Sequence, residues 1–150
     1  MRSSESNPAE SLRLGPLRYL YVGTARFAED LAFYREVLGA ELVWHFRRFG
    51  AEVAAVRLGE GPLYILADHR PAKSTLPIYA VEDLEAFRAS AEARGLKGAH
   101  SVETPDGPCL VLHDPTGNEL GALEEVRPRV LEGAWRTSGN TYAVKGDGSI

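Results

Sequence analysis

The chain has 150 residues and a net charge of −4, with 44% hydrophobic and 25% charged residues. This length and composition predict one globular domain with enough apolar material for a core, and they argue against a disordered chain. A weakly acidic chain without long basic runs is a poor candidate for binding nucleic acid. The apolar stretches are far shorter than a membrane span, so we expect no membrane partner.

The chain has one cysteine, Cys109, which excludes an intrachain disulfide and a thiolate zinc site. The first sixteen residues lack the apolar block of a secretory signal, so we expect a cytoplasmic protein. We predict a disordered leader over residues 1–16, a folded domain over 17–126 and a C-terminal extension over 127–150. The extension contains Trp135, and we expect it to pack on the domain or on a partner.

The first half of the domain predicts one strand, one helix and three further strands. Residues 17–22 alternate as in a strand. Apolar residues then recur at helical spacing from Phe27 to Leu38, and Gly39 is a typical residue after a helix end. Three short strands are predicted at 41–47, 51–58 and 63–67, separated by turns at Phe49-Gly50 and at residues 59–62.

The second half repeats this order. A strand is predicted at 76–81, a helix from Leu84 to Gly95, and strands at 98–103, 109–113 and 119–124. Phe87 follows Phe33 by 54 residues and Gly95 follows Gly39 by 56, so the two halves (17–69 and 75–126) are copies of one β-α-β-β-β unit. The predicted fold class is therefore α+β, built from two such modules.

The paired modules, the segment Phe33-Tyr34-Arg35-Glu36-Val37-Leu38-Gly39 and the turn Asp114-Pro115-Thr116-Gly117-Asn118 resemble the vicinal oxygen chelate superfamily. This superfamily includes glyoxalase I, extradiol dioxygenases and bleomycin-resistance proteins. The resemblance covers about residues 17–124. It implies a half-open barrel whose cleft binds a small-molecule ligand, and it implies a homodimer.

In catalytic members of this superfamily, His, Glu or Gln side chains in the cleft hold a divalent ion. By that resemblance, one metal ligand would stand at Tyr19 and another at Leu76 or Pro77. A third would follow Asp114 by seven residues, at Gly121. These residue types are poor ligands for a divalent ion. We therefore predict no metal and no other cofactor.

The resemblance also indicates where a ligand would bind. Strand alternation places Tyr19 and Tyr21 on the face opposite Leu20 and Val22, and we expect the tyrosines to face the cleft. Tyr64 is expected to join them from the fourth strand. The other predicted ligand-binding residues are Trp44, His45, Arg57 and Gly121.

Three functions remain open from the sequence. The first is metal-independent binding or sequestration of a small molecule, as in bleomycin-resistance proteins. The second is a lyase, isomerase or dioxygenase that uses displaced metal ligands such as His45, Glu119 or Glu124, or that uses Tyr19 as an acid or base. In the third, the segment around Trp135 fills the cleft and the protein is an interaction module.

Overall fold

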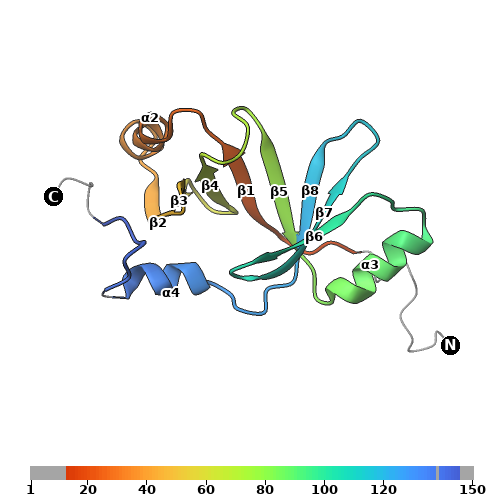
Figure 1. The fold of residues 1–150 in the computed structure, drawn as a ribbon. Coiled ribbons are helices and arrows are strands. Elements are labelled where there is room, and N and C mark those ends of the chain that lie inside the picture. The colour runs from red at the N-terminus through yellow and green to blue at the C-terminus, as the bar shows by residue number, and fades with distance from the viewer. Residues whose placement is uncertain (1–12, 138, 146–150) are drawn as a thin grey trace. The chain divides into compact units, whose positions relative to one another are not determined.

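The computed structural model describes residues 13–137 and 139–145, which fall into two compact units (Figure 1). One unit comprises residues 18–77 and the described residues after 128. The other comprises residues 13–17 and 78–128. No helix in the described part of the chain has the length and hydrophobicity needed to cross a membrane.

Module one has the predicted β-α-β-β-β order. Its elements are β1 (Leu17–Gly23), α2 (Phe27–Ala32), the π-helical turn η1 (Phe33–Val37), β2 (Glu41–Arg48), β3 (Ala51–Arg57) and β4 (Leu63–Ala67). The strands lie in the order β2-β3-β4-β1. β1 runs parallel to β4, and the other neighbours are antiparallel. The predicted helix over 27–38 is therefore real, but its second half is wound as a π-helix.

The sheet of module one is apolar on both faces. α2 covers one face, where Phe27 and Leu31 pack on Ala54, Val56 and Leu66. The opposite face has its own cluster, composed of Val43, Trp44, Phe46, Ala55 and Ile65. We call these the helix face and the tyrosine face, because Tyr19 and Tyr21 pack against the second cluster.

The C-terminal extension covers the tyrosine face of module one. α4 (Val130–Arg136) lies along β2 on the side opposite α2 (Figure 1). Trp135 packs into the cluster, and its indole nitrogen donates to the carbonyl of Val144 at 3.0 Å. The chain then pairs with β2, since the amide of Arg47 donates to the carbonyl of Tyr142 at 2.9 Å.

Module two repeats the same order. Its elements are β5 (Thr75–Ala80), α3 (Leu84–Ala93), β6 (His100–Thr104), β7 (Gly107–His113) and β8 (Glu119–Leu123), with strands in the order β5-β8-β7-β6. α3 packs Leu84 and Phe87 against Leu110 and Ala122. Asp83 caps this helix by accepting a hydrogen bond from the amide of Ala86.

Two residues just before the predicted start of the domain at residue 17 pair with β5. The amide of Gly15 donates to the carbonyl of Ala80, and the amide of Ala80 donates to the carbonyl of Pro16. These bonds attach residues 15 and 16 of the predicted leader to module two. Residues 1–12 of that leader lie outside the described residues.

We expect Trp135→Ala to destabilise the protein by about 2–4 kcal/mol, because it removes a half-buried indole and a hydrogen bond. Urea denaturation of the full chain measures this change. Arg136→Ala is the matched control, since its exposed side chain only pairs with Glu132 one turn away. Equal effects of the two substitutions would contradict the packing of α4 on module one.

Candidate functional site

The tyrosine face of module one carries three of the predicted ligand-binding residues. Tyr19, Tyr21 and Trp44 pack in one cluster there, while Val22 packs on the helix face as alternation predicts. Trp44 is buried and both tyrosines are partly exposed. The two tyrosines are therefore the members of this group that a ligand could contact.

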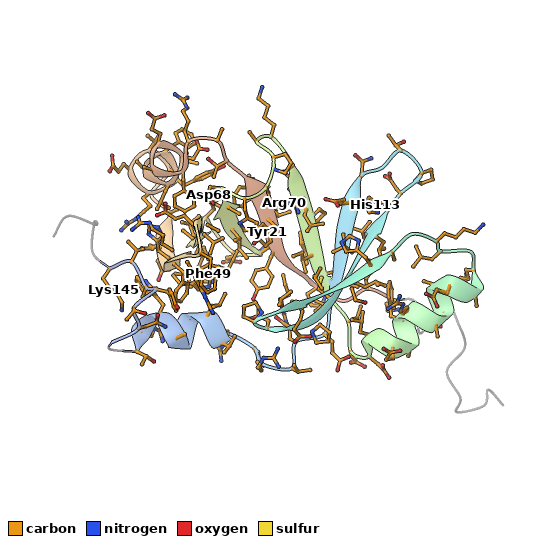
Figure 2. The ribbon with its side chains drawn as sticks, in the orientation of Figure 1. Tyr21, Phe49, Asp68, Arg70, His113 and Lys145 are labelled. Carbon is orange, nitrogen blue, oxygen red and sulfur yellow. The ribbon has the colours of Figure 1, made fainter. Side chains whose placement is uncertain are left out.

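Tyr21 belongs to a polar cluster at the end of β1 and β4 (Figure 2). Its hydroxyl lies 3.2 Å from Nε2 of His69, and the guanidinium of Arg70 lies 5.8 Å from its ring centroid. Burial raises the pKa of Tyr21 above 10.0, although the positive charge of Arg70 acts in the opposite direction. The phenol is therefore protonated at neutral pH and can donate a hydrogen bond.

The structure corrects the predicted face of Tyr64. In the parallel register of β1 and β4, Tyr64 is opposite Leu20, and Leu63 is opposite Tyr19. Tyr64 therefore packs on the helix face, where its ring lies 5.4 Å from that of Tyr34. The expectation that it joins Tyr19 on the cleft side is wrong.

His45 and Trp44, both predicted to bind ligand, lie on opposite faces of the sheet. A bulge between Leu42 and Trp44 interrupts the alternation of β2. Trp44 therefore lies on the tyrosine face, and His45 points to the helix face, where its ring is 5.4 Å from that of Phe27. His45 is 8% exposed and belongs to a different site from the tyrosines.

His45 forms a charged network with the neighbouring strand. Its Nε2 lies 2.6 Å from Oε2 of Glu52, and the same oxygen accepts a hydrogen bond from Arg47 at 2.9 Å. Burial lowers the pKa of His45 below 6.5, and this effect outweighs the opposing influence of Glu52. Glu52 was missed from the sequence, although the hairpin predicted at Phe49-Gly50 places it opposite Arg47.

This network lines a pocket of about 520 Å³ on the helix face. One wall is apolar and comes from Phe27, Leu31 and Ala40. Arg35 and Glu36 of η1 line it as well, and Val144 contributes from the C-terminal extension. A pocket of this volume can hold a small organic molecule.

The two remaining predicted residues lie apart from these groups. Arg57 is at the end of β3, and its Nε is 3.4 Å from Oε1 of Glu41 across the edge of the sheet. Gly121 is buried in β8 of module two. A Cβ added there would be 3.1 Å from Sγ of Cys109 and 3.3 Å from Cγ1 of Ile78. The side chains of Cys109 and Ile78 therefore leave little room for a larger residue at this position.

The positions at which the superfamily places metal ligands do not suit a divalent ion here. Leu76 is buried, Gly121 has no side chain, and Tyr19 packs with apolar neighbours. In residues 13–137 and 139–145, no three His, Cys, Asp or Glu side chains are grouped so that they could hold a metal.

The alternative metal donors have local partners of their own. His45 bonds to Glu52, and Glu119 lies 3.3 Å from Nε2 of His113. Glu124 accepts a hydrogen bond from the amide of Leu84 at the start of α3. Each of the three carboxylates therefore already interacts with a neighbouring group of the protein.

Cys109 is buried in β7. Burial raises the pKa of its thiol to about 11. The thiol is therefore protonated at neutral pH, which is unsuitable for a nucleophile.

These observations define an α+β protein of two β-α-β-β-β modules with a pocket of about 520 Å³. The family model described as a glyoxalase-like domain matches residues 19–123 of this chain. The chain therefore belongs to the glyoxalase-like domain family of the vicinal oxygen chelate superfamily, as the sequence motifs predict. No curated protein matches the chain.

Solved structures share this fold at low sequence identity. Methylmalonyl-CoA epimerase from Mycobacterium tuberculosis has a TM-score of 0.62 and 15% identity, covering 74% of this chain and 88% of the epimerase. Methylmalonyl-CoA epimerase from Streptomyces coelicolor has a TM-score of 0.62 and 14% identity, covering 76% and 99%. Homoprotocatechuate 2,3-dioxygenase from Arthrobacter globiformis has a TM-score of 0.61 and 18% identity, covering 76% and 37%. These likenesses establish the fold.

We expect the imidazole of His45 to titrate below pH 6.5, because burial disfavours its charged form. Glu52→Gln should lower this pKa further, since the carboxylate favours the imidazolium. NMR titration measures both values, with His45→Phe to assign the resonance. An unchanged or higher pKa in Glu52→Gln would contradict the geometry of the pair.

The lowered pKa of His45 also predicts how the free energy of unfolding depends on pH. The unfolded chain takes up a proton at His45 near pH 6.5, while the folded chain does so only at lower pH. The contribution of His45 to folding therefore becomes less favourable as pH falls below 6.5 through the folded pKa. Comparison of wild type with His45→Phe in urea at several pH values isolates this contribution.

Proposed function

We propose that this glyoxalase-like protein binds and sequesters a small organic molecule without the divalent metal of catalytic relatives. The observation that carries the proposal is the polar cluster of Tyr21, His69 and Arg70 beside a partly exposed aromatic face. Ligand sites combine apolar surface with a few convergent polar groups in this way. The function resembles that of bleomycin-resistance proteins.

The chemistry of the cluster favours a planar ligand with a hydrogen-bond acceptor. Tyr19 and Tyr21 offer ring surface for stacking, and the protonated hydroxyl of Tyr21 offers a donor. Arg70 adds positive charge next to that ring. An aromatic molecule with a carboxylate or a carbonyl group would use all three features.

An enzyme of the lyase, isomerase or dioxygenase type is the alternative. The structural likenesses include two epimerases and a dioxygenase, but their identities of 14–18% support only the shared fold. A metal-free enzyme could use Tyr19 as its acid or base. The absence of a grouped set of metal donors in the described residues favours the binding function over metal-dependent catalysis.

We also propose that the protein is cytoplasmic and forms a homodimer. Exposed apolar side chains at the end of the first helical segment support an interface between copies: Phe33, Val37 and Leu38 are 47%, 68% and 52% exposed. Light scattering of the purified chain distinguishes a dimer from a monomer. Val37→Glu should convert the dimer to a monomer. A dimer that persists in this variant would show that the interface does not include this apolar segment.

Metal analysis tests the metal-independent part of the proposal. We expect purified protein, dialysed against Zn²⁺, Mn²⁺ or Fe²⁺ and then against buffer, to retain much less than one ion per chain, because the superfamily positions lack donor groups. Elemental analysis by mass spectrometry measures the ratio. One ion per chain that a chelator removes would overturn this part.

Ligand screening tests the binding part. We expect thermal-shift hits among planar aromatic acids and antibiotics, with bleomycin included in the panel. For any hit, Tyr21→Phe should weaken binding by about 2- to 12-fold, because one hydrogen bond is lost. Calorimetry measures the change. Tyr142→Phe is the matched control, since this tyrosine stacks on Arg48 away from β1.

A further inference from the structure

The pocket beside His45 lies on the sheet face opposite the proposed aromatic site. It is formed within a single compact unit by α2, η1, the hairpin of β2 and β3, and Val144. Its volume of about 520 Å³ falls within the range of about 300–1,000 Å³ that small-molecule sites occupy. The proposed function does not use this pocket.

The polar end of the pocket presents a hydrogen-bond acceptor. Oε2 of Glu52 accepts a hydrogen bond from Arg47, and a carboxylate oxygen acts only as an acceptor, so the contact with His45 places a proton on Nε2. Because burial lowers the pKa of His45, the ring is neutral at pH 7 and Nδ1 carries a lone pair. No residue in the described part of the chain hydrogen-bonds to Nδ1.

The remaining charges of the pocket balance each other. Arg35 and Arg47 contribute two positive charges, and Glu36 and Glu52 contribute two negative charges. This balance disfavours strong selection for either an anion or a cation. The apolar wall of Phe27, Leu31 and Ala40 instead favours a hydrocarbon body.

We propose that this pocket is a second ligand site, which binds a neutral apolar molecule carrying one hydroxyl group, such as a phenol. The apolar body packs against Phe27, Leu31 and Ala40, and the hydroxyl donates a hydrogen bond to Nδ1 of His45. Glu52 and Arg47 are positioning residues, because they fix the tautomer that leaves Nδ1 as an acceptor.

The test uses 2-naphthol as the probe and 2-methoxynaphthalene as its matched partner without a donor. Titration of the full-length protein is followed by two-dimensional NMR and calorimetry. We expect 2-naphthol to shift resonances of His45, Leu31 and Ala40. We expect 2-methoxynaphthalene to bind about 2- to 12-fold more weakly, because it cannot donate to the ring nitrogen.

Two variants localise the binding. His45→Phe keeps a ring beside Phe27 but removes the acceptor, so the two probes should bind with equal affinity. Ala28→Trp occupies the pocket from an exposed position of α2, where a larger side chain does not enter the core. It should abolish binding of both probes while the NMR spectrum of the free protein remains that of a folded chain.

Tyr21→Phe separates this site from the aromatic face. Its affinity for 2-naphthol at the pocket should equal that of wild type, because Tyr21 packs on the other face of the sheet. Shifts of Leu31 and Ala40 that survive in Ala28→Trp, or wild-type shifts confined to the tyrosine face, would overturn the second site. Equal affinity of wild type for the two probes would overturn the hydroxyl assignment.

Discussion

The sheet of module one is apolar on both faces, and each face must be covered by another element. The α2 helix of the β-α-β-β-β unit can cover only one face. The other face exposes Trp44, Phe46 and Ile65 unless something packs on it, and α4 supplies that cover from the C-terminal extension. Residues far apart in sequence thus become one compact unit. One candidate site, the pocket beside His45, lies next to α2. The other contains Tyr19 and Tyr21, which are partly exposed on the face that α4 packs on.

The element order could be predicted from the sequence because it depends on local signals. Alternation, helical spacing and turn residues give the strands and helices of both modules to within a few residues. The π-helical turn at Phe33–Val37 could not be predicted in this way. At its end the amide of Leu38 donates to the carbonyl of Phe33, five residues back, one residue more than in an α-helix.

The candidate site was predicted less well, because side-chain direction depends on register. Strict alternation from Leu42 would put His45 on the tyrosine face, and one bulge reverses it. Tyr64 was assigned to the wrong face because its position depends on the parallel pairing of β4 with β1, which no local pattern reports. The shared face of Tyr19 and Tyr21, opposite that of Val22, was predicted correctly, since β1 alternates without interruption.

The bulge in β2 also determines the chemistry that each face can offer. It places Trp44 among the apolar side chains under α4 and turns the neighbouring His45 toward Glu52 on the other side. A histidine on the tyrosine face could have served as a metal donor there. On the helix face it is instead buried beside a carboxylate that holds one ring nitrogen, so the other is available only as a neutral acceptor. One irregularity in one strand therefore removes a potential metal ligand from the aromatic face and adds a ring nitrogen to a pocket that also carries two arginines and two glutamates.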